Sequence, residues 1–453
     1  MPHENNPHIL GTENIGKLLL QYSIPAIIGM TVTSLYNIID SVFIGHGVGA
    51  IAISGLAITF PLMNLVMAFC QLLSTGGSAI SSIRLGQKDL KGANLILGNV
   101  LVLCIIIAFA FGALFYIFLD PILLFFGASE STLPYARDFM QVILIGTPIS
   151  FTMIGLNNIM RATGYPKKAM ITSMFTVGAN IILAPVFIFY FGWGIRGAAT
   201  ATVISQFLGM IWILCHFFDK ESYVRFQKGI FKLKKRIVLS IFGIGMSPFL
   251  MNVCACMVVI IINNSLQTYG GDLAIGAYGI INRVLMLFVM IVLGMTMGMQ
   301  PIIGYNYGAH QFERVKLTLK KGIMVGVGIT TVGFLACEIF PHFVSAMFTD
   351  SNDLIELANT GLRICVLMFP FVGCQIVITN FFQSIGKAKI SIFLSLSRQL
   401  LFLLPGIIFL PRIMHGVNGV WTSMPISDFI AFVASVLMLL YHIKKMKASI
   451  QTA

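Results

Sequence analysis

The sequence is dominated by apolar runs of about 20–30 residues, separated by short turns that contain glycine, proline or charge. A run of that length crosses the hydrocarbon core of a bilayer as an α-helix, whereas the strands of a membrane barrel need only ~9–11 residues of alternating polarity. Composition agrees, because 57% of the 453 residues are hydrophobic and only 10% are charged. The chain is therefore predicted to be an all-α integral membrane protein.

The apolar runs predict twelve transmembrane helices. They lie near residues 17–44, 51–82, 94–119, 133–157, 166–191, 195–218, 237–264, 274–303, 318–342, 357–382, 389–410 and 418–442. The stretch "MPHENNPHILGTEN" before the first run is polar, so we expect no cleavable signal peptide. The first helix itself is expected to direct insertion.

Basic residues gather on one side of this helix plan. If the N-terminus and every second connection face the same side, that side holds 23 of the 29 lysines and arginines, among them Arg161 and seven in segment 219–236. The other side holds Arg137, Arg196 and Arg412, while Arg283, Arg363 and Arg398 fall in or beside apolar runs. Basic loops stay in the cytoplasm, so both termini are predicted to be cytoplasmic. Nucleic-acid binding is disfavoured as an explanation of the net charge of +13, because the charge is spread over many short connections.

The two halves of the chain resemble each other at a constant offset of 222 residues. The pairs include Gly86 with Gly308, Pro148 with Pro370, "RATG" at 161–164 with "QSIG" at 383–386, Gly194 and Gly197 with Gly416 and Gly419, and Ser205 with Ser427. Each half holds six spans, an even number, so both halves enter the membrane from the same side. We therefore predict two six-helix lobes, 1–218 and 237–453, joined by the basic cytoplasmic linker 219–236 and related by an axis along the membrane normal.

Clusters of residues that support metal or enzyme chemistry do not occur in the sequence. The eight cysteines lie in apolar runs without a CxxC pair, no HExxH motif is present, and no Walker motif points to ATP. We expect no metal, no cofactor and no enzymatic activity. A membrane-embedded enzyme is the remote alternative.

Several segments resemble the multidrug and toxic compound extrusion (MATE) family. They include "SIPAIIGMTVTSLYNIIDSVFIGHGVGAIAISGL" (23–56), "IMRATGYPKKAM" (159–170), "GANIILAPVFIF" (178–189), "GIRGAATATVIS" (194–205) and "QPIIGYNYGA" (300–309). The resemblance covers essentially the whole chain. It implies alternating-access export of amphipathic, mostly cationic compounds, driven by protons or sodium. A lipid-linked oligosaccharide flippase of the same superfamily is the alternative.

Asp40 is the most unusual residue of the first span. A carboxylate at the centre of a membrane helix costs about 2.5–3.5 kcal/mol, and an apolar environment favours its protonated form. In the MATE branch that this chain resembles, an aspartate at this place takes part in ion coupling, together with nearby asparagines and a second aspartate of the fifth helix. Asn180 matches the fifth-helix asparagine, and Thr202 falls within the matching sixth-helix motif. The place of the branch's second aspartate is Ala184, so we expect proton rather than sodium coupling. The alternative is a carboxylate near the helix end that reaches headgroup water.

Pro25 lies fifteen residues before Asp40. A proline inside a helix removes one backbone hydrogen bond and permits a bend. Pro25 is either a hinge that bends when Asp40 takes up a proton or the cause of a permanent kink, and the sequence favours neither.

Other polar residues of the spans have two interpretations each. Arg398 and Asp428 lie at similar depth and are predicted to form a structural ion pair, with a second coupling site as the alternative. Arg283 is a candidate to face Asp40 across the lobes. Asn157, Asn158, Asn180 and Thr202 either line a substrate chamber or join helices through hydrogen bonds. We expect a monomeric, multi-pass protein of the bacterial cytoplasmic (inner) membrane that exchanges protons for small amphipathic substrates.

Overall fold

The computed structural model describes residues 7–349, 351–414 and 416–451, with the side chains of 35–38, 42, 45, 50 and 445–451 left undescribed. Within those residues every regular element is a helix. The side chains of Lys445 and Lys447, which the charge argument counts, therefore lie outside the described residues.

The amino-terminal half begins with a short helix and then forms a bundle of long ones. Its elements are α1 (Ile9–Thr12), α2 (Ile15–Gly47), α3 (Ala50–Gly86), α4 (Leu90–Ile117), α5 (Leu119–Phe125), α6 (Leu133–Ala162), α7 (Pro166–Pro185), the π-helix η1 (Val186–Tyr190) and α8 (Gly194–Phe218).

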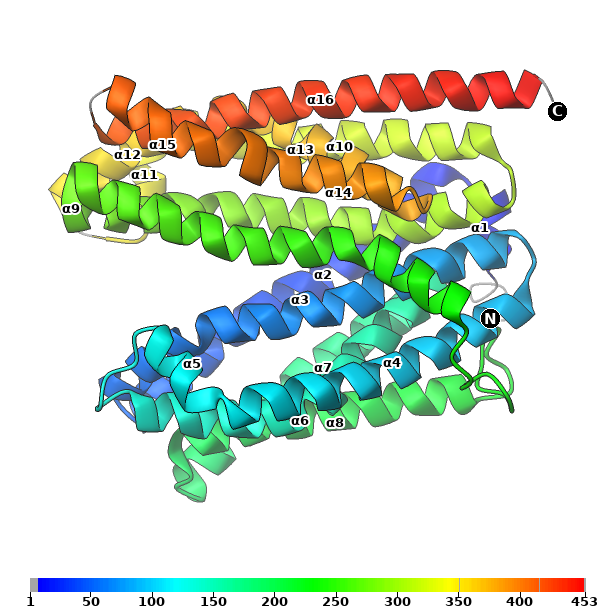
Figure 1. The fold of residues 1–453 in the computed structure, drawn as a ribbon, viewed down its shortest axis with the longest axis horizontal. Helices are drawn as coiled ribbons and strands as arrows, with labels where there is room; N and C mark the ends of the chain where they lie inside the picture. The colour runs from blue at the N-terminus through cyan, green and yellow to red at the C-terminus, as the bar shows by residue number, and fades with distance from the viewer. Residues whose placement is uncertain (1–6, 350, 415, 452–453) are drawn as a thin grey trace.

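The carboxy-terminal half forms a second bundle beside the first (Figure 1). Its elements are α9 (Lys235–Gly308), α10 (Phe312–Ile339), α11 (Pro341–Ala346), α12 (Asn352–Val366), α13 (Phe369–Ser384), α14 (Ala388–Leu396), the π-helix η2 (Ser397–Leu403), α15 (Leu404–Ile413) and α16 (Val417–Gln451).

The twelve predicted spans are all found within these helices. By length and composition, ten helices of the described residues can cross a bilayer, and the pair α12 and α13, bent by 51°, adds an eleventh. The 74 residues of α9 would extend ~110 Å as one straight helix, far more than a bilayer's ~30 Å core. α9 leaves helical geometry at Gly271, where φ is 63° and ψ is −161°, and Figure 1 shows it turning back there. It therefore supplies two spans, and the total is twelve.

Two short helices outside the spans were not predicted from the apolar runs. α5 begins at Leu119 and α11 at Pro341, which are 222 residues apart and occupy the same place in each half. The predicted spans 166–191 and 389–410 are also interrupted by π-helical turns at η1 and η2. Neither feature changes hydropathy, so neither leaves a mark on the pattern of apolar residues.

Contacts between equivalent residues locate the axis that relates the two halves. Ser78 donates a hydrogen bond to Gln300 Oε1 at 3.4 Å, and these residues are themselves 222 apart. A Cβ on Gly86 would collide with the Tyr305 carbonyl oxygen, and a Cβ on Gly308 would collide with the Ile83 carbonyl oxygen. These two contacts exchange under the same offset, as contacts across a two-fold axis must. The lobes are therefore parallel repeats that meet on this axis.

Residues 7–14 lie across the same end of both lobes. The His8 ring is 3.0 Å from the Tyr223 hydroxyl through Nε2 and 3.2 Å from the Tyr305 hydroxyl through Nδ1. Asn306 and Arg314 donate to the Leu10 carbonyl oxygen, at 2.8 and 3.1 Å. The polar start of the chain is thus a folded segment that contacts the linker after α8 and the region where α9 ends and α10 begins.

The two lobes approach each other at the end that carries both termini. Figure 1 shows the bundles closest there and diverging toward the end that holds α5 and α11. The close approach uses small residues, because Gly86, Gly245, Gly298 and Gly308 each face the backbone of the opposite lobe. If the terminal end is cytoplasmic, as the basic residues predict, this close contact of the lobes lies on the inner side of the membrane.

This orientation can be tested by placing single cysteines on opposite ends. Ser351, at the α11–α12 connection, and Lys228, in the linker, are both exposed. We expect Ser351→Cys to react with an impermeant thiol reagent in intact cells and Lys228→Cys to react only after permeabilisation. The unmodified protein with its eight native cysteines is the control, and the reverse labelling pattern would invert the topology.

Candidate functional site

The first membrane helix is pinned to the opposite lobe near its inner end. Asn14 caps the start of α2, because its side chain accepts a hydrogen bond from the Gly16 amide at 2.8 Å. Farther along the helix Ser23 donates to the Met295 carbonyl oxygen at 3.1 Å, and Gly298 lies against the Ser23 backbone. Pro25 follows closely, and α2 continues through it as one helix to Gly47. The outer part of α2 therefore starts at a residue that lacks a backbone N–H.

Asp40 lies on this outer part and is buried. The residue is 7% exposed, and its Oδ1 has no hydrogen-bond partner within the described part of the chain. An ionised carboxylate with a bare buried oxygen is costly. The side chain is therefore expected to hold a proton or to meet a cation.

Two contacts set the depth of Asp40 relative to α7. Gly29 of α2 lies against Ser173 of α7, and Gly47 lies against Ile188 and Phe189. Asp40 is eleven residues beyond Gly29 on α2, and residue 184 is eleven residues beyond Ser173 on α7. Because both helices rise by ~1.5 Å per residue, Asp40 and residue 184 lie at a similar depth. Ala184 is fully buried at this level. At this level α7 thus carries a methyl group, which cannot bind a cation.

Two buried polar residues near the depth of Asp40 belong to α7 and α8. Asn180 lies one turn inward of Ala184 and donates from Nδ2 to Thr202 Oγ1 at 3.1 Å. Both are buried. The structure therefore joins two of the predicted chamber residues to each other, and this bond links neighbouring helices, as the packing interpretation requires.

The inner part of the lobe contains a second polar group. Asn157 donates from Nδ2 to Ser173 Oγ at 3.3 Å, and its Oδ1 is buried without a partner among the described residues. Asn158 accepts from Arg161 NH1 at 3.1 Å. Arg161 was expected in a basic cytoplasmic loop, and that placement is wrong. It belongs to the last turn of α6, is only 6% exposed, and touches Met297 Sδ of the opposite lobe at 3.8 Å.

Two other acids of this lobe lie near helix ends and are paired with arginines. Asp120 accepts two hydrogen bonds of 2.6 Å from Arg137. Asp138 accepts from Arg196 at 2.8 Å. These pairs distinguish Asp40, whose carboxylate has no cationic partner among the described residues.

The carboxy-terminal lobe contains the ion pair that the sequence predicted. Arg398, on the π-helix η2, donates from Nε to Asp428 Oδ1 of α16 at 2.6 Å. The Asp428 side chain is 6% exposed and that of Arg398 is 33% exposed. The equivalent positions of the other lobe hold Thr176 and Gln206, which are neutral. The pair is therefore a feature of one lobe only.

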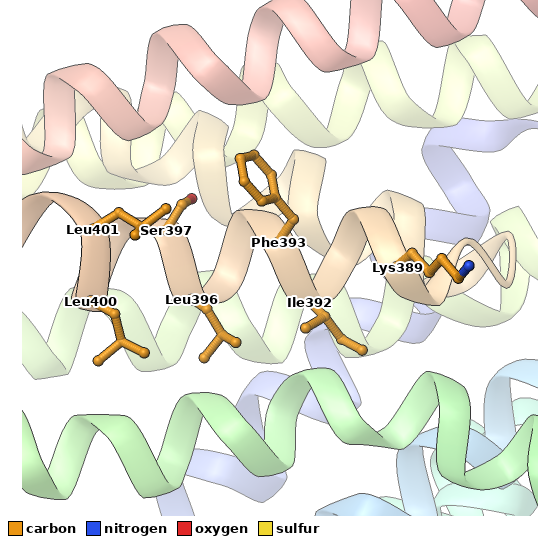
Figure 2. A pocket seen from close by; sticks show the side chains of 7 residues that line it. All are labelled: Lys389, Ile392, Phe393, Leu396, Ser397, Leu400 and Leu401. Carbon is orange, nitrogen blue, oxygen red and sulfur yellow. The ribbon is translucent and has the colours of Figure 1, made fainter.

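Two other places offer less to a cationic ligand. Arg283 is exposed on α9 and forms neither a hydrogen bond nor an ion pair with Asp40 in the described structure. A groove of about 380 Å³ follows α14 and η2 and is lined by Lys389, Ile392, Phe393, Leu396, Ser397, Leu400 and Leu401 (Figure 2). The charged side chain in that lining is a lysine, which repels cations. The interior near Asp40 is the better candidate.

Comparison with known proteins identifies the family. The sequence model of the MatE family matches this chain twice, at residues 25–186 and 247–408, and the two matches begin 222 residues apart. The chain belongs to the MatE family of transporters. The double match agrees with the repeat seen in the sequence and in the contacts across the axis.

Several known proteins are similar to this MatE transporter over nearly their whole length. The multidrug export protein MepA of Staphylococcus aureus (strain MSSA476) is 27% identical over 443 residues, 96% of each chain. A solved structure of the MATE multidrug transporter DinF-BH is 35% identical, with a TM-score of 0.88 over 95% of this chain and 96% of that one. A MATE structure in the bent conformation is 24% identical, with a TM-score of 0.93 over 98% of both chains.

Membership of the MatE family makes this chain a multi-pass membrane transporter rather than an enzyme. Its fold is the two-lobed helical fold of the solved MATE structures. Within that fold, Asp40 is buried with an oxygen that has no partner among the described residues, and Ala184 is fully buried.

Proposed function

We propose that this transporter exports amphipathic, mostly cationic compounds across the bacterial cytoplasmic membrane in exchange for protons. The observation that carries the proposal is the buried oxygen of Asp40, which has no partner among the described residues. The similar protein MepA is named a multidrug export protein, and DinF-BH a multidrug transporter. Both names fit a chamber that takes amphipathic compounds.

Competition for one carboxylate is sufficient for exchange. Binding of either a proton or a cationic group of the substrate removes the energetic cost of leaving the Asp40 oxygen unpartnered. The proton and the substrate cannot both bind there at the same time. Proton binding from the outside therefore releases the substrate, and proton loss to the cytoplasm restores the carboxylate for the next one. A ligand can shift a transporter between states only by binding them differently, and Asp40 provides such a difference.

The neighbourhood of Pro25 supports a hinge. Before Pro25, Ser23 donates to the Met295 carbonyl oxygen of the opposite lobe. Beyond Pro25, Ile27 and Ser34 still contact Gly294 and Met290 of that lobe, and Gly47 at the end of α2 packs against η1 of its own lobe. Pro25 leaves one backbone carbonyl without its helical partner, so α2 can bend there. A change at Asp40 then moves the outer part of α2 while the close contact of the lobes persists, and rocking of the two lobes completes alternating access.

The residues at the level of Asp40 favour protons over sodium. Sodium needs several oxygen ligands, and the described residues near this depth offer one carboxylate, the Asn180 amide and the Thr202 hydroxyl, with Ala184 in place of a second acid. A proton needs only one carboxylate oxygen.

The coupling ion can be tested with purified protein in liposomes. We expect an imposed pH gradient to drive accumulation of a cationic dye such as ethidium without sodium, and a protonophore to abolish it. A sodium gradient at constant pH should have no effect. Transport that requires sodium and survives the protonophore would contradict the proposal.

A further inference from the structure

Arg161 is a buried charge that the proposed exchange does not use. It is 6% exposed, its Nε has no hydrogen-bond partner among the described residues, and its NH1 contacts Asn158 and the Met297 sulfur. None of the ion pairs described in the structure includes it. A buried arginine without a carboxylate is costly, so its retention calls for a role.

The direction of the side chain is the opposite of what an inner helix end favours. Arginines at the ends of membrane helices extend toward the headgroups and water. α6 runs inward, and the Arg161 guanidinium turns back along it to Asn158, toward the chamber. The charge thus lies away from the cytoplasm.

Contacts on α9 place this charge within the close approach of the two lobes. Met297, which touches Arg161, is next to Gly298, and Gly298 lies against the Ser23 backbone of the other lobe. Gly308, where the lobes also meet at Ile83, is eleven residues farther along α9, or ~16 Å along the helix. The Ser78–Gln300 contact on the axis lies between these two levels.

Arg161 is too far from Asp40 to be its counter-ion. Asn157, one turn outward of Arg161, bonds to Ser173, and Ser173 lies level with Gly29. Asp40 is eleven residues farther outward, so the two charges are separated by ~20 Å along the membrane normal. They stand at opposite ends of the amino-terminal interior.

We infer that Arg161 is a fixed positive charge between the lobes that keeps protons and cationic substrates from crossing the region where the lobes are in close contact. An arginine in a narrow passage repels protons and other cations electrostatically. The inference rests on the proposed exchange, because a transporter driven by protons loses its driving force through any passive leak. The equivalent residue of the other lobe is Gln383, so one lobe provides the whole charge.

The test is passive proton flux into liposomes without any substrate, with the membrane potential clamped. Arg161→Gln is expected to raise the flux about ten- to a hundred-fold, the factor that one unit charge ~8 Å away imposes on a cation at an effective dielectric constant of about 20. Arg161→Met, which has no polar group to bury, is the second neutral variant. Arg161→Lys should stay near the wild-type flux.

Moving the charge across the axis supplies the matched control. The double variant Arg161→Gln, Gln383→Arg places an arginine at the equivalent position of the other lobe and should lower the flux again. Wild-type flux in both neutral variants would overturn the inference. Equal leaks in Arg161→Lys and Arg161→Gln would also overturn it, because the side chain would then act by filling space. Failure of proton-driven export in wild-type protein would contradict the proposed function while leaving this substrate-free measurement intact.

Discussion

Asp40→Asn is expected to reduce export of a cationic dye to the level of cells without the transporter. Asparagine keeps the shape of the protonated aspartate but can neither release a proton nor attract a cation. A side chain fixed in one state cannot alternate between proton and substrate, so the cycle stops. The measurement is dye accumulation in cells that contain equal amounts of each protein.

Asp120→Asn is the matched control for this variant. Asp120 lies in the same lobe, but it is partly exposed and bonded to Arg137 at a helix end. Loss of such an exposed pair costs at most about 1 kcal/mol, and export should be retained. Asp40→Asn should also insert and fold normally, since it removes a costly charge from the interior. Wild-type export by Asp40→Asn would show that the carboxylate is only a polar residue near a helix end.

Asp428→Asn is expected to destabilise the protein without stopping proton exchange. Removing one partner of a buried ion pair typically costs about 3–5 kcal/mol, and the partial exposure of Arg398 places this pair near the lower limit. Thermal unfolding in detergent should show a lower midpoint. The double variant Arg398→Met, Asp428→Leu leaves no unpaired charge and should recover much of the loss.

The outcome also separates the two interpretations of the Arg398–Asp428 pair. A structural pair predicts that Asp428→Asn changes the unfolding midpoint more than the dependence of transport on pH. An unchanged midpoint together with lost proton-driven export would identify the pair as a second coupling site, the alternative that the sequence left open.

The helix plan was predictable from sequence because the bilayer imposes it. Every backbone polar group in the membrane must be bonded within a helix, so apolar runs report the spans directly. The offset of 222 likewise predicted the axis, since Ser78 and Gln300 meet on it. Apolar runs say nothing of α5, α11 or the π-helical turns, because these alter backbone geometry while the side chains stay apolar.

The site was predictable only in part. Arg398 and Asp428 were paired correctly because both lie at the same depth on adjacent spans. Arg161 was misplaced, because a basic residue beside "ATG" at a helix end has the sequence of a cytoplasmic loop. Its direction depends on Asn158 and Met297, and contacts between lobes leave no local pattern. The described structure has no hydrogen bond or ion pair between Arg283 and Asp40, and the sequence could not predict this for the same reason.

The most direct test of proton exchange at Asp40 is proton release on substrate binding. Addition of ethidium to purified wild-type protein in weakly buffered detergent, at a pH where the free protein holds the proton, should release close to one proton per bound dye. Asp40→Asn should release none even where it still binds dye, while Asp120→Asn should match the wild type. Equal proton release from Asp40→Asn and wild-type protein would contradict the assignment of Asp40 as the proton carrier.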